Sequence, residues 1–171
     1  MIWRAVDRIW EFPQAPLIMG IVNVTPDSFS DGGRHGTPEA AVQHALHLVE
    51  SGANILDIGG ESSRPGAEPV NEDEEFQRVI PVIEKLARQT DTAISIDTQK
   101  PTIAKEALKA GAIIINDIAA NREDESMWQL VAETNSGYVA MHMLGNPKLM
   151  QRNPKYVDLI NDVEAFFYCR M

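Results

Sequence analysis

The feature that most constrains the fold of this chain is a repeat in which a short apolar run is followed by a loop and then by helical spacing. The apolar runs are rich in Ile and Val and do not alternate with polar residues. Continuous apolarity of this kind indicates strands that are buried on both faces, as in parallel sheets. We therefore predict strands at Leu17–Asn23, Asn54–Gly59, Thr92–Asp97, Ile113–Asp117 and Tyr138–His142.

Helical spacing fills the intervals between these runs and continues after the last one. Apolar residues recur there at i, i+3, i+4 and i+7, which lines one face of a helix. The pattern is carried by Val42, Ala45, Leu46 and Val49 in the first helix and by Phe76, Val79, Ile80 and Ile83 in the second. Three more helices are predicted at Pro101–Gly111, around Met127, Leu130 and Val131, and at Val157–Phe167.

Two of the helix starts carry capping signals. Thr37 followed by Pro38 is typical of an N-cap with proline at the first helical position, and Asn71 with Glu74 resembles a capping box. Pro81 falls inside the second helical pattern, where proline removes a backbone donor. We expect Pro81 either to kink that helix or to mark its true start.

Five β-then-α units in succession predict a parallel sheet with right-handed crossovers, in either an open doubly wound α/β sheet or a (β/α)₈ TIM barrel. Taken singly, a polar residue at a strand end is more often a helix cap or a turn residue. In a barrel such residues converge at one mouth, whereas in an open sheet only those beside the switch point converge. Five in succession favour the barrel, and they are Asn23, Asp57, Asp97, Asn116-Asp117 and His142.

The charge balance excludes several classes of partner. The chain has 15 Lys and Arg against 25 Asp and Glu, a formal net charge of −10, so we expect no binding to nucleic acid. No apolar stretch approaches the ~20 residues of a membrane span, and the scattered charges of residues 1–16 are unlike a secretory signal. Cys169 is the single cysteine, which excludes an internal disulfide. We expect a cytoplasmic protein.

Two loops that follow strands carry candidate binding residues. The loop at 25–33 is long for a strand-to-helix connection and dense in hydroxyls, which is typical of functional lids. The glycine-rich segment 59–66 contains Ser63 and Arg64, a combination that suits phosphate oxygens. The alternative is that Arg64 pairs with a nearby glutamate on the surface.

The segment Met141-His142-Met143 invites a metal or cofactor interpretation. A lone histidine among methionines is more often part of a core, and no second histidine is near it in the sequence. We therefore expect no structural metal site there.

Residues 19–33 read MGIVNVTPDSFSDGG, and residues 57–66 read DIGGESSRPG. These two segments resemble, in order, the two signatures of the dihydropteroate synthases, which are pterin-binding enzymes of folate biosynthesis. Shorter stretches at 95–98, 115–117 and 141–147 also follow the order of that family. The resemblance covers about residues 17–167.

This resemblance implies a (β/α)₈ barrel and a transferase reaction. The family joins 6-hydroxymethyl-7,8-dihydropterin diphosphate to p-aminobenzoate, which yields 7,8-dihydropteroate and diphosphate. Its members are the targets of sulfonamides, and full-length members form homodimers. A pterin-binding methyltransferase domain and a non-catalytic pterin-binding fragment are the alternatives, and the long loop at 25–33 favours the synthase.

The resemblance also implies roles for individual residues. Asn23 would contact the Mg²⁺ that accompanies the diphosphate, and Ser63 and Arg64 would bind phosphate oxygens. Asp97 and Asn116 would bond the edge of the pterin ring. No residue is implied as a certain catalytic group.

Met141 would line the pterin pocket by the same resemblance. The sequence departs from the family at Ser63, where threonine is usual, and serine keeps the hydroxyl that binding needs. A second departure is Ile118-Ala119-Ala120, to which we assign no consequence.

A complete barrel takes ~250 residues, so we expect residues 1–171 to form the N-terminal part of one pterin-binding domain, with 1–16 as an extension. Five strands cannot close a barrel, and we expect two unpaired edges and an exposed apolar sheet face. The chain alone is then expected to be inactive and to aggregate or to need a complementing partner. The resemblance stops near Tyr168, which suggests a frameshift or a truncated gene.

Overall fold

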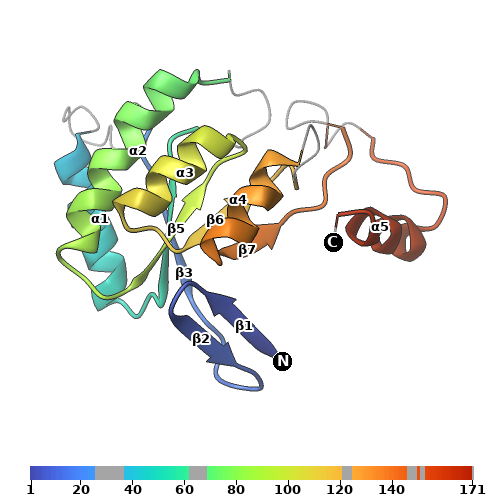
Figure 1. Cartoon of the computed structure of the whole chain (residues 1–171), viewed down its shortest axis with the longest axis horizontal. Helices are drawn as coiled ribbons and strands as arrows, with labels where there is room; N and C mark the ends of the chain where they lie inside the picture. The colour runs from blue at the N-terminus through green and yellow to red at the C-terminus, as the bar shows by residue number, and fades with distance from the viewer. Residues whose placement is uncertain (26–36, 62–68, 121–124, 146–149, 151–152, 171) are drawn as a thin grey trace.

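The computed structural model describes residues 1–171 apart from 26–36, 62–68, 121–124, 146–149, 151–152 and 171. In that part of the chain, a five-stranded parallel sheet follows the order of the sequence, so each strand lies beside its predecessor (Figure 1). All five predicted strands are confirmed: β3 (Met19–Asn23), β4 (Ile55–Gly59), β5 (Ala93–Asp97), β6 (Ile114–Asp117) and β7 (Gly137–Ala140).

Four helices connect successive strands: α1 (Pro38–Glu50), α2 (Glu72–Ala87), α3 (Pro101–Ala110) and α4 (Ser126–Thr134). Each helix contacts the next one along the chain, so the four form a single layer beside the sheet (Figure 1). A doubly wound sheet reverses its strand order and carries helices on both faces. Sequential strands with one helix layer are instead the arrangement of a (β/α)₈ barrel, of which this part of the chain supplies five strands.

The predicted caps start the first two helices. The Thr37 side chain accepts a hydrogen bond from the backbone N–H of Ala40 at 3.3 Å, and Pro38 follows it at the first helical position. The Asn71 side chain accepts one from the N–H of Glu74 at 2.9 Å. Each bond satisfies a donor that the first helical turn leaves unpaired, which is why the helices start at these residues.

The second helix differs from its prediction in two ways. α2 continues through Pro81, so this proline does not mark its start. The carbonyl that Pro81 cannot bond belongs to Gln77, which is exposed and can bond water instead. Phe76, expected on the apolar face, is 40% exposed, whereas its neighbour Glu75 is buried.

The main core lies between the sheet and the helix layer. From the sheet, every second residue of a strand enters this core. From the helices, it includes alanines of α1 and α3, whose small side chains let these helices approach the sheet closely. Since successive strand residues point to opposite faces, the other half of each strand faces away from the helices, toward what is the interior in a barrel. The strand side consists of Val22, Leu56, Ile58, Ile94, Ile96 and Ile115.

A hairpin of β1 (Ile2–Ala5) and β2 (Arg8–Glu11) lies below the sheet in Figure 1. Its Trp3 and Trp10 rings stack with centroids 4.8 Å apart. The hairpin was not predicted, because its charged residues interrupt any apolar run. It covers the starting ends of the strands, where Ala5 forms a second core cluster with Ile55, Ala93 and Ile114.

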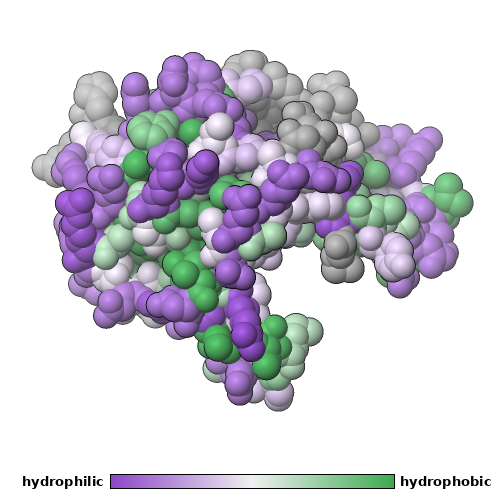
Figure 2. Space-filling view, in the orientation of Figure 1, coloured by the Kyte–Doolittle hydropathy of each residue, from purple (hydrophilic) through white to green (hydrophobic). Residues whose placement is uncertain are grey.

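Both outer strands of the described sheet have an unpaired edge, as predicted. On the first of them, β3, the Ile21 side chain is 61% exposed on the face away from the helices. Figure 2 shows mostly hydrophilic side chains over the helices, while hydrophobic ones are exposed on the hairpin. The exposed Ile21 is thus an apolar side chain on the sheet face that a closed barrel would enclose.

The chain after β7 departs from its prediction. The strand ends at Ala140, so His142 lies beyond it and is not a strand-end residue. The last helix, α5 (Leu159–Tyr168), lies away from the sheet and buries none of its residues (Figure 1). No described helix has the length and apolarity that crossing a membrane requires.

The packing of the hairpin under the sheet can be tested at Gly137. A Cβ placed there would lie 2.9 Å from the Cβ of Ala5, so we expect Gly137→Ala to lower the free energy of unfolding by about 1–3 kcal/mol. Adding Ala5→Gly should recover part of that loss, because it removes the opposing methyl group. Urea unfolding of both single variants and the double variant measures the coupling, and strictly additive losses would contradict this contact.

Candidate active site at the strand ends

Four residues at the carboxyl ends of neighbouring strands form one row across the sheet. The strand register pairs Asn23 with Gly59, Gly59 with Asp97, and Asp97 with Asn116. The residue before each of them belongs to the main core, so the row itself faces away from the helices. Three residues that the sequence nominated, Asn23, Asp97 and Asn116, are therefore brought together on one face.

Gly59 leaves space in the middle of this row. A Cβ at this position would lie 3.4 Å from Oδ2 of Asp97 and 3.8 Å from Oδ1 of Asn23. The amide of Asn23 and the carboxyl group of Asp97 thus border the same space, which any larger side chain at position 59 would fill. The oxygen atoms at its border can accept hydrogen bonds from a ligand that lies against the Gly59 backbone.

Asp57 lies two residues before Gly59 on β4, on the same face of the sheet, and is paired with Ser95 of β5. Its carboxyl group is buried, and its Oδ2 accepts a hydrogen bond from Nδ2 of Asn116 at 2.9 Å. This bond joins β4 to β6 across β5. Burial raises the pKa of Asp57 above its ordinary value.

Asp97 carries the one carboxyl group of this row, and its pKa is strongly shifted. Burial, followed by repulsion from Asp57, Glu75, Asp117 and Glu61, raises its pKa to about 7. A carboxyl group that titrates near neutrality can donate or accept a hydrogen bond on the edge of a heterocycle. Strongly perturbed carboxyl groups of this kind are typical of binding and catalytic sites.

Lys100 joins the loop after β4 to two helices. Lys100 precedes the first residue of α3, and its Nζ lies 2.6 Å from Oε2 of Glu61. The same Nζ forms an ion pair with the buried Glu75 of α2. Burial opposes the charge of Lys100, but the hydrogen bonds that its ammonium group donates to the two glutamates raise its pKa. Next to this ion pair, Arg78 donates a hydrogen bond to the carbonyl oxygen of Gly60 at 2.7 Å. The base of the loop that leads to Ser63 and Arg64 is therefore anchored on both sides.

Met141 is held beside the row by Asp117. The backbone N–H of Met141 donates to the carbonyl oxygen of Asp117 at 3.2 Å. The buried Asp117 carboxylate accepts from the backbone N–H of Ala119 and from the Tyr138 hydroxyl, each at 2.8 Å. Burial and this last bond raise the pKa of Tyr138. The half-buried Met141 thus follows directly from the end of β7, next to the strand that carries Asn116.

Two of the predicted binding residues, Ser63 and Arg64, lie outside the described residues, as does most of the loop at 25–33. His142 packs against aromatic rings, with the Phe166 centroid at 4.8 Å and the Tyr156 centroid at 5.9 Å. Within the described ranges, no group of three His, Cys, Asp or Glu side chains is placed to hold a metal ion.

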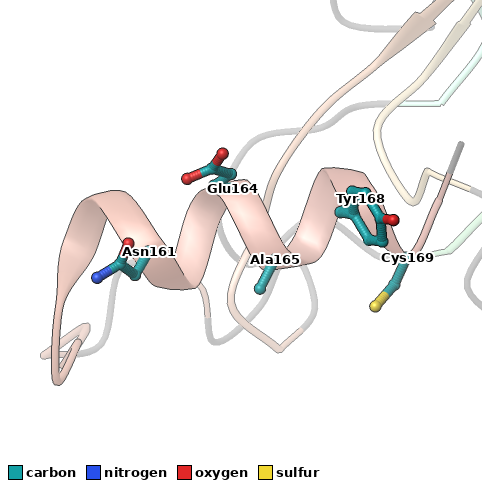
Figure 3. Close-up of a pocket in the computed structure, with 5 residues that line it drawn as sticks. All are labelled: Asn161, Glu164, Ala165, Tyr168 and Cys169. Carbon is teal, nitrogen blue, oxygen red and sulfur yellow. The ribbon is translucent and has the colours of Figure 1, made fainter.

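A shallow hollow lies beside α5, away from the strand ends, and Figure 3 shows its lining side chains. They project from the outer surface of a helix that buries nothing, and we assign this hollow no function. The lining residues are Asn161, Glu164, Ala165, Tyr168 and Cys169.

Sequence reasoning missed the ionic contacts that support the row. Glu75 looks like an ordinary acidic residue of a first helical turn. Nothing in the sequence indicates that Lys100, 25 residues later, reaches it. The sequence indicates Asp57 only as a residue at the end of a strand, because its bond to Asn116 depends on the register of three strands.

Comparisons with known proteins agree with this geometry. Residues 19–171 match the pterin binding enzyme family. The chain is 51% identical over 152 residues to the dihydropteroate synthase of Escherichia coli K12, which covers 89% of this chain and 54% of that protein. The chain therefore spans about half the length of this curated relative.

Solved structures of similar proteins share the fold. A Yersinia pestis dihydropteroate synthase in complex with a sulfonamide drug is 45% identical, with a TM-score of 0.88 over 99% of this chain and 61% of that one. A Xanthomonas albilineans dihydropteroate synthase with 4-aminobenzoic acid is 47% identical, with a TM-score of 0.85 over 99% of this chain and 59% of that one. The arrangement described above is thus part of the barrel of these enzymes.

The raised pKa of Asp97 predicts how stability depends on pH. Because the folded protein holds this proton up to about pH 7 whereas the unfolded chain releases it near pH 4, the protein loses stability as the pH rises between these values. In Asp97→Asn, we expect this decrease in the free energy of unfolding to be smaller by on the order of 1–4 kcal/mol. Urea unfolding of the wild type and of Asp97→Asn at pH 5 and pH 8 tests this. If the free energy of unfolding falls equally in both proteins between these pH values, the pKa of Asp97 is not raised.

The ion pair of Lys100 is expected to contribute to stability. Lys100→Met leaves the buried Glu75 without its cation, and should cost about 2–4 kcal/mol of unfolding free energy. The matched control is Lys109→Met, which breaks the more exposed pair with Glu106 on the same helix and should cost under about 1 kcal/mol. Similar losses in the two variants would contradict a special role for Lys100.

Proposed function

This chain belongs to the pterin binding enzyme family, and we propose that it supplies the pterin-binding side of a dihydropteroate synthase. The reaction would join 6-hydroxymethyl-7,8-dihydropterin diphosphate to p-aminobenzoate. The observation that carries the proposal is the row in which Asn23, Asp97 and Asn116 border the space above Gly59. Relatives with this fold include one whose structure holds 4-aminobenzoic acid.

The pterin ring would bind with its edge against Asp97 and Asn116. A pterin edge alternates N–H donors with acceptors, so it needs partners of both kinds. The carboxyl group of Asp97, with a pKa of about 7, can serve as either, and the amide of Asn116 offers one of each. Met141, next to this row, would cover one side of the ring.

The diphosphate would bind at the other end of the row. Ser63 and Arg64 would bond phosphate oxygens from a loop whose base is anchored by Lys100 and Arg78. Asn23 offers an amide oxygen beside the open space, and Mg²⁺ is commonly held by one or two protein oxygens together with substrate phosphates. The residues present thus fit a magnesium ion that arrives with the substrate, and such an ion would neutralise the leaving diphosphate.

In the proposed reaction, the amine nitrogen of p-aminobenzoate forms a bond to the exocyclic methylene carbon of the pterin. The bond from that carbon to the diphosphate oxygen breaks, the diphosphate takes the electron pair, and the amine loses a proton. The contribution of this chain would be to hold the ring and the phosphates in line for the substitution. We propose no residue of the chain as the proton acceptor.

The direct test joins residues 1–171 to the C-terminal part of the Escherichia coli relative that this chain does not cover. We expect the fusion to form dihydropteroate from both substrates, measured by liquid chromatography, and the 171-residue chain alone to form none. Pterin binding without product in a folded fusion would favour a non-catalytic pterin-binding protein. Methyl transfer from a methylated pterin would favour a methyltransferase.

Asp97→Asn in the same fusion tests the pterin edge. Asparagine keeps the shape but cannot offer the same donors and acceptors, so pterin binding should weaken by about 1–3 kcal/mol. Isothermal titration with 6-hydroxymethyl-7,8-dihydropterin measures this. Unchanged affinity would mean that Asp97 does not contact the ring.

A further inference from the structure

Asp57 has a buried carboxyl group for which the proposed reaction has no direct use. Its side chain is 4% exposed, and its Oδ2 accepts the hydrogen bond from Nδ2 of Asn116 at 2.9 Å. Its Oδ1 accepts no hydrogen bond of good geometry among the described residues, although the adjacent Ser95 hydroxyl lies close enough to lower the pKa of Asp57. A buried, incompletely paired carboxyl group is costly, so it requires an explanation.

The hydrogen bond fixes the orientation of the Asn116 amide. An ionised carboxylate only accepts hydrogen bonds, so it selects the NH₂ end of an amide over the oxygen end. Turning the amide by 180° would place two oxygen atoms against each other. The Asn116 oxygen is therefore held away from Asp57, and within the described part of the chain it accepts no hydrogen bond and is not enclosed.

We propose that Asp57 is a positioning residue, which holds Asn116 so that its amide oxygen accepts a hydrogen bond from an N–H on the edge of the bound ring. This inference rests on the proposed function, because the ring it names is the pterin. Asp57 is too far from the surface to touch the ring itself, because it lies two residues before Gly59 on β4, below the row of Asn23, Gly59 and Asp97. It acts on the ligand only through Asn116.

Two variants at position 57 separate the hydrogen bond from the charge. Asp57→Asn removes the charge but keeps an oxygen that can accept from Asn116, whereas Asp57→Leu removes both. For 6-hydroxymethyl-7,8-dihydropterin binding to the fusion, we expect Asp57→Leu to weaken affinity by about tenfold or more. Asp57→Asn should stay within about threefold of the wild type, which is a rescue that a merely structural role does not predict.

Ser136→Ala is the control, since it changes a buried polar residue just before β7, at the opposite end of the strand from the row, and leaves Asp57, Ser95 and Asn116 in place. Its pterin affinity should equal that of the wild type. Urea unfolding shows that each variant is folded before it is titrated. Equal affinities for Asp57→Leu and Asp57→Asn, in folded proteins, would overturn the inference.

A second measurement does not depend on the ligand. In the wild type and in Asp57→Asn, the side-chain amide protons of Asn116 should exchange slowly with water, as followed by nitrogen-15 NMR. In Asp57→Leu they should exchange at least about tenfold faster. Fast exchange in the wild type overturns the positioning role itself, whereas slow exchange without any pterin binding overturns the proposed function and the ligand named here.

Discussion

The structure depends on the register of its parallel strands. Because neighbouring strands run in the same direction and in sequence order, their last residues fall into one row, and every second residue faces away from the helices. That constraint places Asn23, Gly59, Asp97 and Asn116 side by side although up to 93 positions, 116 − 23, separate them in the sequence. A slip of one residue in any strand would turn its member of the row into the core.

The same packing concentrates negative charge. Burial raises the pKa of Asp97 most, and repulsion from the nearby Asp57, Glu75, Asp117 and Glu61 raises it further. Lys100 neutralises part of this charge at the edge of the row, and amide or hydroxyl donors satisfy other oxygen atoms. The site thus keeps a carboxyl group that titrates near neutrality, at a cost in stability that the surrounding core offsets.

The sequence was sufficient to predict the five strands, the helix caps at Thr37 and Asn71, and the three row residues Asn23, Asp97 and Asn116. These features depend on local patterns or on strand ends, which one-dimensional spacing records. The hairpin under the sheet, the burial of Glu75 and the bond between Asp57 and Asn116 were not predictable. They are contacts between elements far apart in the chain, and local propensity carries no information about such partners.

The central claim is that the row at the strand ends recognises a pterin ring. The most direct measurement is a crystal structure of the fusion with 6-hydroxymethyl-7,8-dihydropterin bound. The account predicts the ring edge within hydrogen-bonding distance of Asp97 and Asn116, with the Asn116 amide still bonded to Asp57. A ring that binds elsewhere, or that leaves Asp97 and Asn116 in contact with water alone, would contradict it.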